Sequence, residues 1–451
     1  MKIKELKIQN LFGQFSYHMN FEESNEVFII TGPNGYGKTT ILRIIESLAK
    51  QNFIFFYSIS FDKIEFIFDN EQRFVIKQEI VPLVVFPGQS VLSDRIVEPE
   101  RKTVFSYFIN KNDEKERFLI SKAELNNIIK GLPAELRNND SQKDYKSEAF
   151  ENYLKNHKFI YDMLLQRQMC IQIPILLKGF TVKFISAQRL SVSETLIQNN
   201  LVLGNQLLPI QTAGAVKKST IKNTVQKFGN QLRAAKTFYL NKSQEIDLKL
   251  IDDLLNENYE VLSEEMYNKK VTVLTKKVEE LQQFSLIDSV KIKPYMKDKD
   301  KILSAYINGL EKKLSVYNEI LAKLKVFDEL LTGLKFKNKR FVYSLKDGLS
   351  VRMKTDGSQL DMNKLSSGEQ SEIIMLYDFL FEIQKDSILL IDEPENSLHV
   401  AWQIRVKDDL KGIAEASGIQ IIIATHSPQI LAGDFDDSFD LLENNTKKDV
   451  Q

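Results

Sequence analysis

The pattern of apolar and polar residues over the first 200 positions predicts a strand-rich α/β domain. Ile3, Leu6 and Ile8 begin an edge strand at the start of the chain. The unbroken apolar run 27–30 is typical of a strand buried on both faces, and residues 39–49 place their apolar side chains on one side of a helix. Strands followed by an amphipathic helix favour a layered α/β fold.

Alternating apolar and polar residues predict two hairpins, and apolar runs predict two more buried strands. The segments 61–68 and 73–80 alternate around a polar turn, and 337–353 does so around an Asp-Gly pair. Near the end of the chain, 388–391 and 419–424 are short apolar runs of the kind found in buried strands. The α/β character therefore returns in the last third of the chain.

The segment from about 215 to 333 has the periodicity of helices. Apolar residues that step by alternating fours and threes predict a coiled-coil-like helix about 43 Å long. The repeating positions are Leu303, Ile307, Leu310, Leu314, Tyr317, Leu321, Leu324 and Leu331. The stretch 271–281 has the same spacing, so an antiparallel helical arm and an ordinary packed helical subdomain are both open interpretations.

Together these patterns predict an α/β head that is split in sequence by an inserted helical arm. The N-terminal half of the head would span 1–214, the arm 215–333 and the C-terminal half 334–451. A chain of 451 residues has room for two or three domains of ordinary size.

The composition argues against several classes of protein. With 61 basic and 61 acidic residues, the charge gives no support to a general nucleic-acid-coating role. The single cysteine, Cys170, excludes a disulfide framework and a four-cysteine zinc site. No apolar run reaches the roughly 18 residues of a membrane span, and the N-terminus has no signal-peptide core. We therefore expect a cytoplasmic protein with no membrane partner.

Residues 32–39 predict a phosphate-binding loop between the buried strand and the amphipathic helix. The stretch reads Gly32-Pro33-Asn34-Gly35-Tyr36-Gly37-Lys38-Thr39 and is followed by Thr40. Its glycines allow successive amide groups to point at phosphate oxygens at the positive end of the helix. Lys38 would neutralise the β- and γ-phosphates of a nucleotide, and the Thr39 hydroxyl would hold Mg²⁺. A chance glycine-rich turn is disfavoured, because the strand and the helix flank the loop as this motif requires.

Two adjacent carboxylates, Asp392 and Glu393, end the apolar run 388–391. Such a pair at the end of a buried strand is costly unless a cation or a proton balances it. Alone, the pair would also fit an acidic turn before Pro394. The presence of the phosphate loop favours a site for a metal ion and hydrolysis instead.

A serine–glycine turn precedes the acidic pair by 27 residues and opens a predicted helix. It reads Leu365-Ser366-Ser367-Gly368-Glu369-Gln370. Its amides and hydroxyls can hold a γ-phosphate, and the same residues also fit a helix-capping box. Both interpretations can hold.

In this order, the phosphate loop, the serine–glycine signature and the acidic pair resemble the nucleotide-binding engine of ABC ATPases. The resemblance implies ATP and Mg²⁺ as cofactors, with Asp392 completing the Mg²⁺ coordination and Glu393 positioning and deprotonating the attacking water. It also implies a homodimer, in which the signature of one subunit closes over ATP held by the other. The signature residues concerned are Ser366, Ser367, Gly368 and Gln370.

Three further residues match positions of functional residues in ABC ATPases. His426 follows the apolar run 421–425, where the family has a histidine that contacts the γ-phosphate and senses hydrolysis. His399 lies where the family has the loop linking two active sites, although a simple surface turn fits as well. Gln188 matches the glutamine loop that touches Mg²⁺, with a solvated strand end as the alternative.

The run 217–242 is strongly basic and contains no acidic residue before its last lysine. Lys222, Arg233 and Lys236 can share one helical face, on which a phosphate-rich or acidic partner could dock. A solvated helix face is the more common reason for such a run.

The stretches 184–189, 391–399 and 423–428 look like the branch of ABC ATPases found in prokaryotic phage-defence systems. Length and layout are most similar to the AriA-type ATPase of PARIS, and the Septu ATPase is second. The resemblance implies an oligomeric sensor that holds a separate nuclease toxin and releases it on detecting a phage protein, such as an acidic DNA mimic. Only 25 residues follow His426, so we expect the nuclease to act in trans.

The alternative function is a DNA-repair or chromosome-maintenance ATPase that clamps DNA. It would share the motifs, but the balanced charge and the lack of a cysteine zinc hook weigh against it. Many repair-type relatives carry Asn-Phe-Arg near the start of the chain. This sequence has Asn10-Leu11-Phe12-Gly13 there, so the arginine of a contact to ATP is missing at that place.

Overall fold

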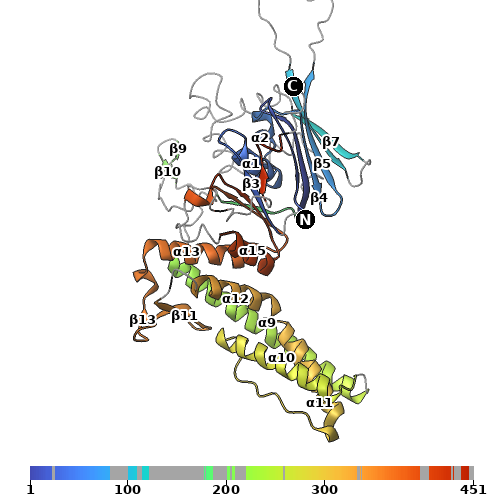
Figure 1. The fold of residues 1–451 in the computed structure, drawn as a ribbon, viewed down its shortest axis with the longest axis vertical. Coiled ribbons are helices and arrows are strands. Elements are labelled where there is room, and N and C mark those ends of the chain that lie inside the picture. The colour runs from blue at the N-terminus through green and yellow to red at the C-terminus, as the bar shows by residue number, and fades with distance from the viewer. Residues whose placement is uncertain are drawn as a thin grey trace, which may run out of the picture. The chain divides into compact units, whose positions relative to one another are not determined.

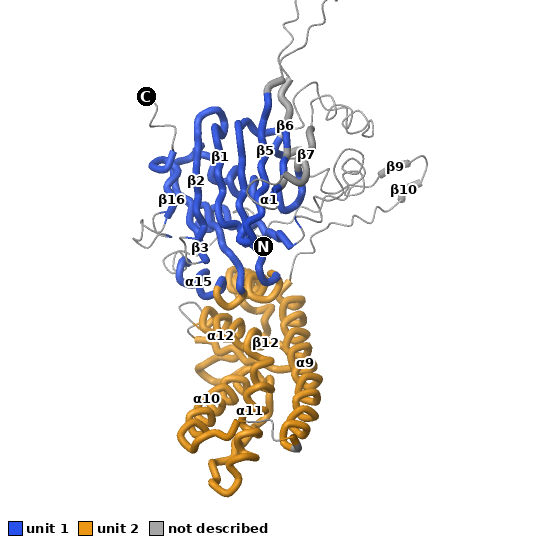
Figure 2. The backbone as a smooth tube through the Cα atoms, turned by 90° about the vertical axis from the view of Figure 1, so that its right-hand side faces the viewer, with its two compact units in different colours: residues 1–216, 384–414, 418–451 blue, residues 217–383, 415–417 orange. Residues whose placement is uncertain are grey.

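A computed structural model of the chain divides into two compact units (Figure 2). The first contains residues 1–216, 384–414 and 418–451, and the second contains 217–383 and 415–417. The residues described are 1–22, 26–81, 100–108, 114–120, 177, 179–185, 201–203, 206–208, 220–256, 260–332, 336, 338–396, 406–427, 430 and 438–445. Each unit is described by itself.

A five-stranded parallel sheet organises the first unit, and its strand β3 is labelled in Figure 1. The strand order is β16-β3-β15-β14-β8. The bounds are β3 Val27–Thr31, β8 Val182–Ile185, β14 Ile388–Asp392, β15 Gln420–Ala424 and β16 Ser438–Asp440. The three central strands are buried along their whole length, which explains their unbroken apolar runs. Because all neighbours are parallel, the carboxyl ends of strands far apart in sequence meet at one edge of the sheet.

A six-stranded antiparallel sheet forms the second layer of this unit, in the order β2-β1-β4-β5-β6-β7. Its strands are β1 Ile3–Leu11, β2 Phe15–Asn20, β4 Lys63–Phe68, β5 Arg73–Val81, β6 Glu100–Phe108 and β7 Glu114–Ile120. The pairing of β4 with β5 confirms the first predicted hairpin. The buried side chain of Gln420 joins the two sheets, since it accepts from the Ile3 amide and donates to the Ile3 carbonyl.

Three helices and a small hairpin complete the first unit. Helix α1 (Lys38–Ala49) packs against the parallel sheet, with the apolar side chains of its predicted face buried. The others are α2 Phe53–Ser58, most of α15 Val406–Ser417, and the hairpin of β9 Leu201–Leu203 with β10 Gln206–Leu208. The predicted fold class is confirmed: this is a mixed α/β protein whose parallel sheet combines strands from both ends of the chain around an inserted helical region.

The second unit contains the helices α9 Ile221–Leu255, α10 Glu264–Gln283, α11 Asp300–Ser315 and α12 Asn318–Thr332. All eight apolar positions of the predicted coiled-coil-like repeat are buried. The prediction of one continuous helix is wrong, because α11 ends at Ser315. The amides of Val316 and Tyr317 bond to carbonyls three residues back instead of four. The buried Tyr317 hydroxyl donates to the Leu286 carbonyl, so this turn is tied to a neighbouring segment.

Side-chain pairs define the direction of each helix. The pairs Tyr239–Tyr317 and Asp247–Lys313 show that α9 runs antiparallel to α11 and α12. Along these pairs the residue number rises in α9 and falls in its partner helices. For α10 both numbers rise together: Lys270 bonds to Glu311 and Glu280 to Lys325. Helix α10 is therefore parallel to α11 and α12, and the antiparallel partner within the arm is α9.

The second unit also contains a small sheet and the helix that follows the signature. The strands are β11 Lys339–Ser344, β12 Gly348–Met353 and β13 Gln359–Leu360, and β11 pairs with β12 as the predicted hairpin. Helix α13 spans Ser367–Tyr377 and passes into a π-helix over Asp378–Glu382. By contacts, 334–383 is compact with the arm helices, although the sequence prediction grouped it with the head.

Phe228 of α9 lies at the centre of an aromatic cluster in the second unit, with ring centroids 5.4–6.1 Å from its neighbours. Those neighbours are Phe327, Tyr343, Tyr377 and Phe381.

In the part of the chain that the structure describes, no helix is long and apolar enough to cross a membrane.

Candidate phosphate-binding site

The predicted phosphate loop connects β3 to α1 in the first unit. Gly32, Gly35 and Gly37 all have positive φ angles, of 140°, 89° and 94°. At Gly37 the space for a side chain is also tight, because a Cβ atom would lie 3.1 Å from Cδ2 of Leu11. Pro33, Asn34 and Gly35 are exposed, Tyr36 is half-buried, and Thr39 and Thr40 lie in the first turn of α1.

Lys38 is the first residue of α1, and its side chain folds back over the loop. The Nζ atom donates to the carbonyl oxygens of Gly32 at 2.6 Å and Pro33 at 3.1 Å. Burial lowers the pKa of Lys38, and the nearby carboxylates of Glu393 and Asp392 oppose that shift. No side chain caps α1, so its first amides remain available at the positive end of the helix. An ammonium group and free amides at one point form a site for an anion such as phosphate.

Asp392 is the last residue of β14, and its carboxylate meets the helix that follows the loop. Its Oδ1 atom accepts a hydrogen bond from the Thr39 hydroxyl at 3.2 Å. Burial raises the pKa of Asp392, an effect that the Thr39 hydroxyl opposes and the Glu393 carboxylate reinforces. A buried carboxylate beside a hydroxyl supplies the hard oxygen ligands that Mg²⁺ prefers, and a bound cation would favour the ionised form. These two residues therefore fit the predicted metal site.

Glu393 is held in an unusual backbone conformation at the edge of the sheet. Its φ angle is +49°, which is uncommon for a residue with a side chain, and its amide donates to the Ala424 carbonyl at 2.8 Å. Its Oε1 atom lies 3.7 Å from Nδ1 of His426. Backbone strain of about 1–3 kcal/mol persists where surrounding contacts enforce it, and it gathers at functional sites. The structure thus brings Lys38, Thr39, Asp392, Glu393 and His426 together at one sheet edge.

Sequence reasoning missed residues that support the loop. Tyr17 of β2 donates its hydroxyl hydrogen to the Tyr36 carbonyl at 2.9 Å, and the ring of Phe15 lies 5.0 Å from that of Tyr36. Phe12 is 40% exposed and has a φ angle of +54°; a Cβ atom on Gly37 would lie 3.5 Å from its ring. The signal available in the sequence was a phenylalanine followed by a glycine directly after the first predicted strand.

Glu395 was also missed, although it follows the acidic pair closely. Its carboxylate accepts from the Thr425 hydroxyl at 2.9 Å and from the His426 amide at 3.1 Å. The third acid of the run 392–395 was the signal that could have drawn attention to it.

The signature segment lies in the second unit and forms the capping box that its sequence allows. Ser366 accepts from the Glu369 amide at 3.3 Å, and the Glu369 carboxylate accepts from the Ser366 amide at 3.0 Å. Lys339 pairs with Glu369 at 2.6 Å. The side-chain amide of Gln370 donates to the carbonyls of Asn363 and Leu365, so it shapes the preceding turn. Ser367 and Gly368 are exposed at the start of α13.

The basic run forms the first part of α9, and most of its described cations have partners. Lys227 pairs with Glu382 at 3.1 Å and Lys242 with Glu245 at 2.7 Å. Arg233 donates to the Leu345 carbonyl and to Asn230, while Lys236 lies 4.0 Å from Asp288.

The proposed basic face of α9 also carries a packing contact. A Cβ atom on Gly348 would lie 2.4 Å from the Val225 carbonyl and 2.9 Å from the Gly229 amide, so β12 packs closely against this helix. The β11–β12 hairpin therefore covers part of the helical face that Gly229 shares with Arg233 and Lys236, while Arg233 itself is exposed. Lys222 is exposed. Gln188, His399, Lys217 and Lys218 lie outside the described residues.

Fold and site are those of a P-loop ATPase, with a glycine-rich loop, the hydrogen-bonded Thr39–Asp392 pair and an acidic residue at the carboxyl edge of a parallel sheet. The chain belongs to the family AAA_15, AAA ATPase domain, which it matches over residues 1–431. It is thus an ATPase of that family, which implies the use of ATP. No curated protein matches the chain.

Among solved structures, the chain is similar to SMC head domains. One, from Pyrococcus furiosus, has an extended coiled coil and is bound to the C-terminal domain of ScpA. It is 15% identical, with 96% of this chain and 91% of that chain covered and a TM-score of 0.30. The SMC head domain from Thermotoga maritima is 13% identical, with 97% and 92% covered and a TM-score of 0.31.

Proposed function

We propose that the sheet-edge site binds ATP with Mg²⁺ and hydrolyses it in an ABC-type manner. The observation that carries this proposal is the convergence of Lys38, the Thr39–Asp392 pair and Glu393 at the ends of β3 and β14. Lys38 and the loop amides would hold the phosphates, while Thr39 and Asp392 would hold the metal ion. Gln188 would add a ligand to the same ion. A bound Mg²⁺ would supply charge neutralisation at the β- and γ-phosphates.

Glu393 would orient and deprotonate the attacking water, and His426 would contact the γ-phosphate. The Glu393 side chain is 31% exposed and the His426 side chain 46%, which supports a role toward a ligand rather than in the core. Glu393→Gln removes the base but keeps the shape, so ATP should bind and turnover should fall by about a hundredfold or more. Phosphate release and nucleotide binding, measured on the same preparation, test this assignment.

We also propose that two copies of the chain close over ATP, with Ser366, Ser367 and Gly368 of one copy facing the γ-phosphate held by the other. The exposed start of α13 supports this role, since helix N-termini favour anions. Glu393→Gln with ATP should then produce a stable dimer, which light scattering after size exclusion would detect. A Glu393→Gln protein that stays monomeric with bound ATP would argue against the ATP sandwich.

In the cell, we propose that this ATPase is the sensor and scaffold subunit of an anti-phage defence system. It would form higher homo-oligomers, hold a separate nuclease subunit and release it when a phage trigger protein is detected. The support is the similarity of 184–189, 391–399 and 423–428 to the ATPases of PARIS and, second, of Septu. Within this proposal, 1–214 and 334–451 serve as the ATPase head, and the arm 215–333 connects it to partners.

Expression of the tagged chain with its native flanking genes tests this cellular role. Mass spectrometry of proteins that co-purify in stoichiometric amounts should identify a small nuclease, and its fold would distinguish a PARIS-type from a Septu-type partner. A chain that purifies without a protein partner, carries DNA and hydrolyses ATP faster with duplex DNA would instead favour the DNA-clamping ATPase.

A further inference from the structure

A buried carboxylate joins the ends of two neighbouring strands at the site. Glu395 lies in the short 3₁₀ turn Pro394–Asn396 that follows β14, and its side chain is only 8% exposed. Its Oε1 atom accepts from the Thr425 hydroxyl and the His426 amide, both of which follow β15. Thr425 is itself fully buried, and its amide donates to the Ile30 carbonyl of β3 at 3.0 Å. Glu395 therefore anchors the segment that carries His426 to the turn that carries Glu393.

The same carboxylate oxygen faces the His426 ring. Oε1 of Glu395 lies 3.3 Å from Nδ1, closer than the 3.7 Å that separates Nδ1 from Oε1 of Glu393. An ionised carboxylate attracts the N–H side of an imidazole, so a contact at this distance favours a ring orientation with Nδ1 toward Glu395. With Nδ1 beside Glu395, Nε2 is the ring nitrogen that could meet a ligand.

We propose that Glu395 is a positioning residue that orients His426 for its contact with the γ-phosphate. This inference rests on the proposed role of His426. Glu395 would set the separation between the side chain that activates water and the side chain that senses phosphate, since its carboxylate accepts from the His426 amide and lies 3.3 Å from Nδ1 of the ring. It need not touch the nucleotide, and its contribution passes entirely through His426.

A purely structural clamp is the competing explanation, and its consequences differ. A clamp that only stabilises the fold would affect the protein equally with or without the His426 ring. A positioning residue loses its effect once that ring is removed, so the two substitutions would be non-additive.

The test uses Glu395→Gln, His426→Ala and the double variant in the full chain. A glutamine carbonyl can still accept from Thr425 and from the His426 amide, but it removes the negative charge beside Nδ1. We expect kcat for ATP hydrolysis to fall about 10- to 100-fold, as for other residues that orient a functional side chain, while KM for ATP changes by less than about threefold. The double variant should be no slower than His426→Ala alone.

Glu65→Gln is the matched control. The Glu65 side chain is also 8% exposed, but it pairs with Lys63 and Arg73 in the antiparallel sheet. It should alter thermal stability and leave kcat unchanged. If Glu395→Gln unfolds, Glu395→Asp keeps the charge with a shorter reach, and its loss of kcat should likewise disappear in the His426→Ala background.

Each outcome has a separate meaning. Normal kcat in Glu395→Gln, or losses that multiply in the double variant, would overturn the positioning role. If His426→Ala alone retains full turnover, the proposed sensor role of His426 fails and the inference about Glu395 fails with it. A slow His426→Ala beside a normal Glu395→Gln would leave the sensor role in place and remove only the role of Glu395.

Discussion

The two units of this chain place their charged groups in opposite ways. In the first unit, polar side chains from α1, β14 and the residues that follow β14 and β15 converge at one edge of a sheet. In the second, charges pair along helix surfaces, as Lys270 does with Glu311 and Lys325 with Glu280. In the first unit, the Lys38 ammonium group and the first amides of α1 are therefore directed at one point. In the second unit, each of these charges is balanced by a neighbouring side chain.

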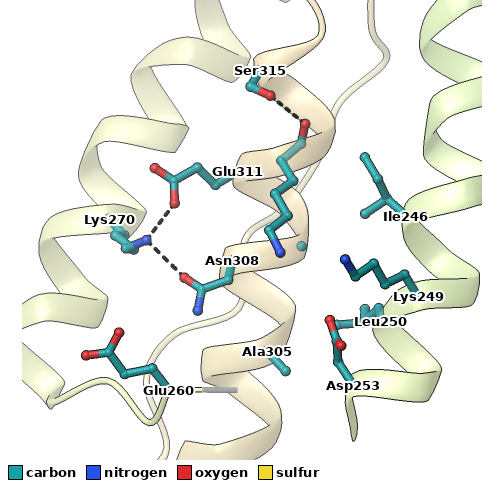
Figure 3. Close-up of a pocket in the computed structure, with 12 residues that line it drawn as sticks. Ile246, Lys249, Leu250, Asp253, Glu260, Lys270, Ala305, Asn308, Glu311 and Ser315 are labelled. Carbon is teal, nitrogen blue, oxygen red and sulfur yellow. Dashed lines mark hydrogen bonds and ion pairs between the residues drawn. The ribbon is translucent and has the colours of Figure 1, made fainter. Parts of the chain in front are cut away.

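A cavity in the second unit illustrates the difference. It measures about 750 Å³ and is lined by residues of α9, α10 and α11, together with Glu260. Figure 3 shows Lys270 bonded to Glu311 and Asn308 across this cavity, so its ammonium group already has acceptors. Lys38 of the phosphate loop instead donates to main-chain carbonyls, and burial lowers its pKa. The candidate site is therefore identified in this chain by the convergence of strand ends and not by the size of a cavity.

Among the variants that test this contrast between the two units, Lys38→Met should have the largest effect. Loss of the ammonium group should reduce ATP turnover about a thousandfold, because phosphoryl transfer depends on charge neutralisation at the phosphates. Stability should be maintained, since the substitution also removes the cost of burying a charge. Phosphate release and thermal unfolding measure the two effects. Turnover within tenfold of the unaltered protein would show that this lysine does not face the nucleotide.

Asp392→Asn should come next, with turnover reduced by about a hundredfold and stability increased at neutral pH. The pKa of Asp392 is raised chiefly by burial. Its contribution to stability is therefore complete below the unfolded pKa and lost as pH rises through the folded pKa. The variant should melt above the unaltered protein in metal-free buffer, by a margin that shrinks on acidification. A margin that widens toward low pH would contradict this assignment.

In the second unit, Phe228→Ala should lower the stability of the fold without removing a functional group of the site. Phe228 is buried and contacts four aromatic rings, so its truncation should lower the free energy of unfolding by about 3–5 kcal/mol. Urea unfolding followed by circular dichroism measures the loss. Exposed Phe238 on the same helix is the matched control, and Phe238→Ala should change stability little. Equal losses in the two variants would mean that the aromatic cluster does not hold this unit together.

The smallest effect is expected for Lys270→Gln in the cavity. Its partner Glu311 has a side chain that is 52% exposed, and such pairs contribute less than about 1 kcal/mol. ATP turnover should be unchanged. If this variant slowed hydrolysis as strongly as Lys38→Met, the division into a converging site and locally paired charges would not hold.

Much of the site could be predicted because its residues lie in short local motifs. The phosphate loop required only glycines, a lysine and a threonine between a strand and a helix, and the acidic pair required only the end of an apolar run. Glu395 and Tyr17 could not be assigned in the same way. Their roles depend on partners 30 and 19 residues away in sequence, which the sheets bring close.

The helical region shows the same limit. Its apolar repeat correctly identified the buried positions, since a periodic stripe must face a core in any packing. It did not show the break at Val316 and Tyr317 or the direction of α10, because both depend on neighbouring segments. The acidic partners of the basic run, Glu382 and Asp288, likewise could not be predicted from the run itself.

The sequence by itself predicted a phosphate loop beside an acidic strand end, and it determined that a helical region interrupts the α/β fold. Those features are encoded by residue type and spacing over a few positions. Only the tertiary structure decided that Glu395 meets His426, that Tyr17 supports the loop and that a hairpin covers part of the basic helix. The physical reason is that such contacts arise from the parallel alignment of strands and from the close approach of backbones, neither of which leaves a local pattern in the sequence.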